Sequence, residues 1–258
     1  MTTNFTSYID LAQVILYVFL GAFLYLVYYL HRESKREGYP LESDRSGAVK
    51  VQGYPSVPKP KTYLLADGTS VQAPRAHPHD NRPVNATPSA NFPGAPLIPI
   101  GDPMTAGVGP GAYADRRDIP DTTVHGTPKL VPLRAAAGFY VDPKDPNPIG
   151  MTVVGADGET GGVVCDVWVD QAEYLIRYFE VETGEKGKKR NVLLPANLAR
   201  VVGSAKQVRV KSILGGQFAS VPTQKKPDMV TRLEEEKIFG FYGAGTLYAT
   251  PQRAEPLL

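Results

Sequence analysis

Residues 11–30 read LAQVILYVFLGAFLYLVYYL and contain no charged side chain. At about 1.5 Å per residue, a helix of this length spans about 30 Å, the thickness of the hydrocarbon core of a bilayer. A buried core helix and a cleaved signal peptide are the alternatives. The stretch is too long for a signal peptide, and it lacks a basic segment before it and a small-residue cleavage site after it. The sequence therefore predicts one transmembrane helix over residues 11–30.

The charges that flank this stretch predict its orientation. Asp10 is the only charged side chain before it, whereas Arg32, Lys35 and Arg36 follow within six residues of its end. Basic residues are retained on the cytoplasmic side of a membrane. The short N-terminus, residues 1–10, is therefore expected outside the cytoplasm and the rest of the chain in the cytoplasm. We also expect Arg32, Lys35 and Arg36 to contact anionic lipid headgroups.

One face of the predicted helix carries Tyr17, Gly21, Tyr25 and Tyr28, at spacings of four, four and three residues. The last two tyrosines also suit an aromatic belt at the membrane interface, so that reading stays open for them. Tyr17 lies too deep for a belt, and Gly21 beside it permits close approach of another helix. We expect this face to pack against helices of a partner protein.

Composition limits the remaining possibilities. The chain has 258 residues and a formal net charge of +2. So balanced a charge creates no broad field for nucleic acid, and no nucleic acid is expected as a partner. The single cysteine, Cys165, excludes an intrachain disulfide and a cysteine-rich metal site. Because it lies in an apolar run, we predict an inert thiol in the core.

Residues 38–110 hold 13 of the 24 prolines, which excludes long helices and central strands there. The segment is either a disordered linker or an extended strap on a surface. Its regularly spaced aromatic and aliphatic side chains favour the strap, because disordered linkers are poor in such residues. Within it, Thr62–Leu65, an Asp67-Gly68 turn and Ser70–Gln72 predict a β-hairpin.

Beyond residue 130 the pattern becomes that of a β-protein. Short runs with period-two alternation occupy 151–154, 163–170, 175–182, 192–194 and 208–213. Strands at this spacing predict a small closed or nearly closed barrel. A helix is expected over Met229–Phe241, ended by Gly240, Gly243 and Gly245 and followed by a loose tail. The expected division is 1–10, 11–30, 31–130 (juxtamembrane segment and strap), 131–250 (barrel and helix) and 251–258 (tail).

Acidic side chains are concentrated around one predicted hairpin. They are Asp166, Asp170, Glu173, Glu180 and Glu182, with Arg177 among them. Crowded carboxylates cannot all ionise at low cost, so such a group shares protons and can pass one on near neutral pH. The alternative is a solvated charged face in which Arg177 is the counter-ion. Spacing alone favours the second interpretation.

Motifs of common enzymes are absent from the sequence. It contains no phosphate-binding loop, dinucleotide fingerprint, HExxH or CxxC, and no nucleophile with a base can be assembled. His77 and His79 with Asp80 could form a metal cluster, but a solvated loop is favoured in a proline-rich segment. We therefore expect no catalytic residue and no metal or cofactor bound by this chain.

Several longer motifs, taken in order, carry a resemblance that covers nearly the whole chain. They are HRESKREGYPLES, PKPKTYLL, IGDPMTAGVGPGAYADRRDIP, AAAGF, NPIG, DVWVD and LEEEKIFGF. With these motifs the chain resembles the H subunit of the purple-bacterial photosynthetic reaction centre.

That resemblance implies a single transmembrane helix, an extended proline-rich strap, a mainly-β cytoplasmic domain of the PRC-barrel type and a short C-terminal helix. It implies a subunit of the chromatophore (intracytoplasmic) membrane that caps the cytoplasmic side of the L and M subunits and neighbours the core light-harvesting antenna ring. Bacteriochlorophyll, bacteriopheophytin, quinones, carotenoid and non-haem iron are expected on L and M. A structural scaffold without any role in proton transfer is the alternative function.

The resemblance also implies a proton route to the secondary quinone. Asp170 and Glu173, with Arg177 nearby, match the residues of that route. At the surface where protons enter, the family has an aspartate and two histidines. Here only His125 matches, and Thr123 and Thr127 take the other two places. One imidazole still relays protons near pH 6–7. Inhibition by metal ions, which needs clustered ligands, is expected to be weaker.

Overall fold

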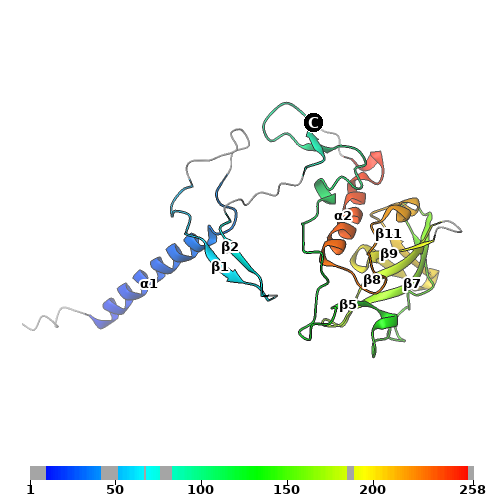
Figure 1. The fold of residues 1–258 in the computed structure, drawn as a ribbon, viewed down its shortest axis with the longest axis horizontal. Coiled ribbons are helices and arrows are strands. Elements are labelled where there is room, and N and C mark those ends of the chain that lie inside the picture. The colour runs from blue at the N-terminus through cyan, green and yellow to red at the C-terminus, as the bar shows by residue number, and fades with distance from the viewer. Residues whose placement is uncertain (1–9, 42–51, 67, 76–82, 185–188, 255–258) are drawn as a thin grey trace, which may run out of the picture. The chain divides into compact units, whose positions relative to one another are not determined.

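The computed structural model describes residues 10–41, 52–66, 68–75, 83–184 and 189–254. The chain forms two compact units, one of residues 1–82 with 92–94 and one of 83–91 with 95–258. Figure 1 labels the elements of both units. Residues 95–130, the second part of the predicted strap, thus belong to the same unit as the β-domain.

The first unit begins with α1 (Leu11–Ser34), which continues four residues beyond the predicted end. Asp10 caps its N-terminus, because its carboxylate accepts a hydrogen bond of 2.9 Å from the backbone N–H of Ala12. His31 and Arg32 in the last turn complement the helix dipole and favour the extension. No residue of α1 is buried within the chain, and the helix is long and apolar enough to cross a membrane.

The predicted hairpin is confirmed. Strands β1 (Lys61–Leu64) and β2 (Ser70–Ala73) pair antiparallel, with Lys61 opposite Ala73. Between them the N–H of Leu65 donates to the carbonyl of Thr69 at 2.8 Å. Asp67 of the predicted turn lies outside the described residues, and Gly68 has the positive φ of 79° that the turn requires.

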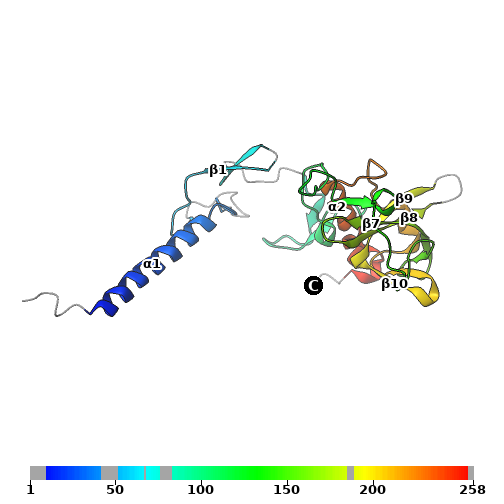
Figure 2. The same cartoon turned by 90° about the horizontal axis from the view of Figure 1, so that it is seen from below.

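The second unit is mainly β, as predicted (Figures 1 and 2). A separate hairpin joins β3 (Ala86–Pro88) and β4 (Leu97–Pro99). The main sheet has the order β10-β11-β6-β7-β8-β9, and β5 pairs with β7. Its strands are β5 (Leu130–Pro132), β6 (Thr152–Val154), β7 (Thr160–Asp170), β8 (Leu175–Thr183), β9 (Arg190–Pro195), β10 (Ala199–Val202) and β11 (Gln207–Val210). Strand β11 ends three residues before the end of the predicted run 208–213.

The long strand β7 is the centre of this sheet, because β5, β6 and β8 all pair with it. Val164, Asp166, Trp168 and Asp170, which alternate along one face of it, are buried. The interpretation of a solvated charged face is therefore wrong for Asp166 and Asp170. Two register shifts, at 164–166 and 168–169, interrupt the alternation, and Val167 and Val169 are buried as well. Val169 packs with Val131 and Ala136 in a second, smaller core.

The prediction that Cys165 is a core thiol is wrong, because Cys165 is exposed. Its sulfur is partly shielded and donates to the carbonyl of Glu180 at 3.4 Å. This shielding, together with the charge of Glu180, raises the pKa of Cys165 to about 11. The thiol is therefore protonated and unreactive at neutral pH although it is not in the core.

The C-terminal helix α2 (Arg232–Tyr248) starts three residues later than predicted and ends seven residues later. Thr231 and Glu234 form a capping box at its start. The predicted stop at the glycines is wrong, because Gly240 and Gly243 lie inside the helix. A Cβ at Gly240 would lie 2.9 Å from the carbonyl oxygen of Gly111, and one at Gly243 would lie 2.3 Å from that of Pro110. These glycines therefore let a backbone segment lie directly against the helix.

The segment after α2 is not loose as far as residue 254. Pro251–Arg253 forms a single 3-10 turn, η7. The Arg253 guanidinium donates to the carbonyls of Ser212 at 2.7 Å, Gly245 at 2.6 Å and Lys211 at 2.9 Å. One side chain thus fastens the end of α2 to the loop after β11.

We predict that Gly243→Ala destabilises the second unit. Overpacking against the Pro110 carbonyl costs about 1–3 kcal/mol, while the better helix propensity of alanine returns about 1 kcal/mol. Thermal unfolding of the full chain in mild detergent, followed by the fluorescence of Trp168, should show a lower midpoint. Gly216→Ala is the matched control, because no atom lies within 4 Å of its added Cβ. Equal midpoints for the two variants would show that the close approach is unimportant.

Candidate functional site

The turn between β7 and β8 holds a buried carboxylate, Asp170, whose side chain has no exposed surface. One of its oxygens, Oδ1, accepts hydrogen bonds of 3.0 Å from the N–H groups of Ala172 and Glu173. Its backbone carbonyl accepts another, of 2.9 Å, from Tyr174. An aspartate that bonds the backbone two and three residues ahead is a common means of making a turn. The side chain therefore shapes the turn from which Glu173 projects.

Two cations neutralise this carboxylate. The other oxygen, Oδ2, lies 3.2 Å from Nζ of Lys129 and 3.5 Å from Nε of Arg177. Lys129 also donates to Oε1 of Glu173 at 2.8 Å. These contacts to Oδ2 are ion pairs, and within the described part of the chain no group donates a hydrogen bond to this buried oxygen. We call Asp170, Glu173, Lys129 and Arg177 the Asp170 cluster.

Lys129 is the member of this cluster that sequence reasoning missed. It immediately precedes β5, whose Leu130 stands opposite Asp170 in the ladder. The carbonyl of Lys129 accepts a 2.9 Å hydrogen bond from the N–H of Gln171. The hydrogen bond to Glu173, followed by the pairing with Asp170, raises the pKa of Lys129. No local pattern reveals the contact, because it depends on a pairing between distant strands.

His125 lies at an exposed turn four residues before Lys129. The N–H of Thr123 donates to the carbonyl of Thr127 at 2.8 Å, and the two hydroxyl oxygens are also 2.8 Å apart. The backbone N–H of His125 contacts Oγ1 of Thr123 at 3.3 Å. The two threonines therefore converge beside His125 and close the turn. The same chain segment continues directly into the Asp170 cluster.

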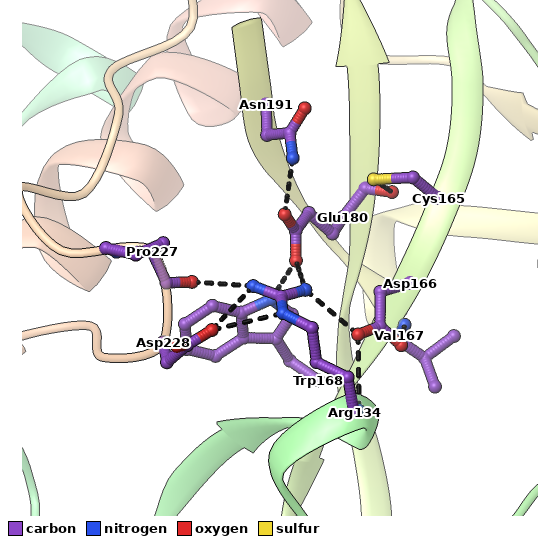
Figure 3. A network of polar contacts seen from close by, with 9 residues as sticks. All are labelled: Arg134, Cys165, Asp166, Val167, Trp168, Glu180, Asn191, Pro227 and Asp228. Carbon is purple, nitrogen blue, oxygen red and sulfur yellow. Dashed lines mark hydrogen bonds and ion pairs between the residues drawn. The ribbon is translucent and has the colours of Figure 1, made fainter.

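A second cluster surrounds Arg134, where Asp166, Glu180 and Asp228 converge on one guanidinium (Figure 3). The NH1 group lies 2.9 Å from Asp166 and 2.6 Å from Glu180, and NH2 donates to Asp228 at 2.8 Å. Burial alone would lower the pKa of Arg134. The hydrogen bonds and negative charges of Glu180, Asp228 and Asp166 raise it by more, so the pKa of Arg134 is raised. We call these four residues the Arg134 cluster.

The remaining acceptors of this cluster are also occupied. Glu180 accepts from Nε1 of Trp168 at 3.0 Å and from Asn191 at 2.6 Å, and Asp166 accepts from the N–H of Val167 at 2.8 Å. The predicted single group of acids is thus divided in two by Arg134 and Lys129. Glu182 belongs to neither cluster and pairs with Lys189 at 2.5 Å.

The predicted packing face of α1 is exposed within the chain. The hydroxyl of Tyr17 accepts a hydrogen bond of 2.8 Å from Gln13, one turn earlier. The Tyr28 ring lies 6.0 Å from that of Tyr54, and Tyr25 stacks on Tyr29 at 6.4 Å. No atom lies within 4 Å of a Cβ added at Gly21. Packing of this face against a partner stays a prediction.

The basic residues after the membrane stretch have internal partners. Lys35 is 4% exposed, and its ammonium group donates to the carbonyls of Gln52 at 2.9 Å and Pro55 at 2.5 Å. Arg36 donates to the carboxylate of Glu33 and to the carbonyls of Lys59 and Ala73. These bonds fasten the following segment to the end of α1. Lipid contact by Arg32, Lys35 and Arg36 stays a prediction.

Among the described residues, no group of three or more histidine, cysteine or acidic side chains is arranged to hold a metal ion. His77, His79 and Asp80, the predicted alternative, lie outside the described residues.

Two family models match the chain. The model of the photosynthetic reaction centre H-chain N-terminal region matches residues 3–135, more than half of the sequence. The model of the PRC-barrel domain matches residues 144–216, which include β6 to β11. The resemblance seen in the sequence motifs is confirmed. The chain belongs to the photosynthetic reaction centre H-chain family, as a membrane-associated, single-pass subunit of a photosynthetic complex.

Proposed function

We propose that this subunit caps the cytoplasmic side of the L and M subunits and carries part of the proton route to the secondary quinone. The pigments, the quinones and the iron are proposed to belong to L and M, with the antenna ring outside them. Membership of the family supports this assignment. One observation supports the proton route above all: the fully buried carboxylate of Asp170 lies beside the half-exposed Glu173, and both are paired with Lys129.

Reduction of a quinone to a quinol needs two electrons and two protons. Negative charge that is not neutralised in a pocket of low dielectric constant is very costly, so the second electron requires protons to arrive. A capping domain keeps bulk water away from such a pocket and must supply the protons by another means. Titratable side chains spaced between the surface and the pocket meet this need.

The order of groups on the chain suits such a route. His125 is exposed at its turn, and the same segment leads to Lys129, whose ammonium contacts both Glu173 and Asp170. Glu173 has a side chain that is 51% exposed, whereas that of Asp170 has no exposed surface. Oδ2 of Asp170 accepts no hydrogen bond from the described residues, so it can accept one from water or from a protonated neighbour. The positive charges of Arg177 and Lys129 stabilise the negative charge of the Asp170 carboxylate.

A structural scaffold is the second candidate, and a specific observation favours it. Asp170 makes the β7–β8 turn through its bonds to Ala172 and Glu173, and the Arg134 cluster joins three separate segments. Such carboxylates serve folding without any proton transfer. A neutral isostere distinguishes the two functions, because a scaffold tolerates it at Glu173.

We also propose that the N-terminus is periplasmic and the β-domain cytoplasmic. The basic residues after α1 support this orientation, since Lys35 and Arg36 are held beside the end of the helix by their bonds to the following segment.

We predict that Glu173→Gln slows transfer of the second electron to the quinone, on the order of 10²-fold at alkaline pH, because a proton relay is lost. Flash kinetics of the complex across a pH series measure this. Glu182→Gln is the matched control, since Glu182 is a glutamate near the far end of β8 and pairs with Lys189. An unchanged rate and pH profile for Glu173→Gln would remove Glu173 from the route and favour the scaffold.

We predict weak inhibition of proton uptake by Zn²⁺, because His125 alone offers one ligand where a site needs three or four. Thr123→Asp combined with Thr127→His should create strong inhibition, since the two side chains converge at this turn. The measurement is the rate of second-electron transfer against Zn²⁺ concentration. Adding His125→Ala to the double variant should reverse the gain. Equal sensitivity of the natural and double-variant complexes would contradict the proposed point of proton uptake.

We predict that Gly21→Leu weakens association with pigment-bearing partners. The leucine meets no atom of this chain, so any loss must come from a partner helix that approaches Gly21 closely. The yield of pigment that copurifies with the chain in mild detergent measures the effect. Ala22→Leu, which places the same side chain about 100° around the helix, is the control. Equal yields from both variants would show that this face is not the contact.

A further inference from the structure

A further acid, Glu235, lies partly buried near the Asp170 cluster without belonging to it. It stands in α2, and Tyr178 of β8 donates its hydroxyl to Oε1 at 2.6 Å. Tyr178 is 1% exposed, and its ring packs edge-on against Phe239, one turn further along α2, at 5.9 Å. The carboxyl group is therefore held between the sheet and the helix by one short hydrogen bond.

Glu235 and Tyr178 line a hollow of about 250 Å³ together with Arg177. The other walls are largely apolar and are formed by Leu175, Ile176, Ala196, Asn197 and Phe239. Leu175, Arg177, Asn197 and Phe239 are exposed, so the hollow opens to solvent at its rim. Arg177 is the residue whose Nε lies 3.5 Å from Asp170. One guanidinium thus stands between the Asp170 carboxylate and the hollow in which Glu235 lies.

The charges that face Glu235 come from three elements. Arg177 and Tyr178 face it from β8, and Arg116 and Asp121 face it from the segment before β5. On α2 itself the neighbours are Glu236, which pairs with Arg116 at 2.7 Å, and Arg232, which pairs with Asp121 at 2.5 Å. Arg116 and Asp121 are thus each partly neutralised by a partner. Arg177 is left as the main cation acting on Glu235.

Among the influences on the pKa of Glu235, burial is the largest. It raises the pKa of Glu235, against the lowering effects of the Tyr178 hydrogen bond and of Arg177. Burial and the neighbouring Glu235 also raise the pKa of Tyr178, so the phenol keeps its proton and acts as a donor. Glu235 therefore changes between carboxylate and carboxylic acid at a higher pH than an exposed glutamate does.

We propose that Glu235 is a proton-holding site behind the Asp170 cluster, which exchanges its proton with water through the hollow and is coupled to Asp170 through Arg177. In the step, an O–H bond of a hydronium ion of the solvent breaks and an O–H bond forms on the Glu235 carboxylate, which leaves a water molecule and a neutral carboxylic acid. When negative charge appears near Asp170, Arg177 is drawn toward that charge and stabilises the Glu235 carboxylate less, so Glu235 takes up a proton. The coupling to light-driven chemistry rests on the proposed function, whereas the proton-holding property does not.

The first experiment tests proton holding in the dark on the full chain in mild detergent. An infrared pH titration follows the carbonyl stretch of protonated carboxyl groups. Glu235→Gln should remove one carboxyl that titrates above the ordinary range of glutamates. Tyr178→Phe and Arg177→Gln should each shift that titration to higher pH, because each removes a group that stabilises the carboxylate. A purely structural role for Glu235 would leave the direction of these shifts unexplained.

Glu159→Gln is the control, because Glu159 is an exposed glutamate of the same unit. If Glu235→Gln removes no more signal in the upper range than Glu159→Gln does, the proposal is wrong. If a signal is lost but Tyr178→Phe does not raise its midpoint, the assigned geometry is wrong. Circular dichroism of each variant confirms that α2 and the sheet are intact.

The second experiment measures flash-induced proton uptake by the complex with a pH-indicator dye. Glu235→Gln should lower the number of protons taken up per flash while the rate of second-electron transfer stays above that of Glu173→Gln. Unchanged uptake would overturn the coupling to Asp170. Failure of the proposed function would appear differently, as an unchanged electron-transfer rate in Glu173→Gln, and would leave the dark titration of Glu235 intact.

Discussion

The β-domain depends on the pairing of carboxylates that its central hairpin buries. Asp166, Asp170 and Glu180 are each less than a tenth exposed, and a buried charge without a partner costs several kcal/mol. The hairpin itself supplies backbone N–H groups and an indole N–H, but not enough positive charge. The missing charge comes from Lys129 and Arg134, which lie outside it. Folding of the hairpin therefore requires that another segment be brought alongside.

That segment is β5, only three residues long, with one of the two cations just beyond each end. Its ladder places Leu130 opposite Asp170 and Pro132 opposite Trp168, so Lys129 reaches the turn and Arg134 reaches the middle of the hairpin. A one-residue slip would move both cations away from their acids and would take Leu130 out of the main core and Val131 out of the second core. The register of one short strand thus sets the electrostatics of both clusters.

Local sequence patterns correctly predict the elements that are determined by residues close together in the sequence. The apolar run of α1, the β1–β2 hairpin and the strands around β7 follow from hydropathy, turn residues and alternation. The errors concern contacts between distant segments. Gly240 and Gly243 continue α2 because a backbone segment packs against them, and Lys129 enters the site through a strand pairing. Cys165 alternates with the buried Val164 and Asp166 and lies on the exposed side of β7. In the site, Asp170 and Glu173 were expected together, but the division of the acids into two clusters was not.

The two clusters differ in how completely their acceptors are used, and that difference bears on function. In the Arg134 cluster, Glu180 and Asp166 have donors on every carboxylate oxygen, so a proton added there would displace an existing bond. In the Asp170 cluster, Oδ2 of Asp170 is held only by ion pairs, and Glu173 reaches solvent. A saturated network fixes a fold, whereas Oδ2 of Asp170 keeps a lone pair to which no described residue donates a hydrogen bond. The proposed proton route therefore belongs at the end of β7 rather than at its middle, although the middle holds more buried acid.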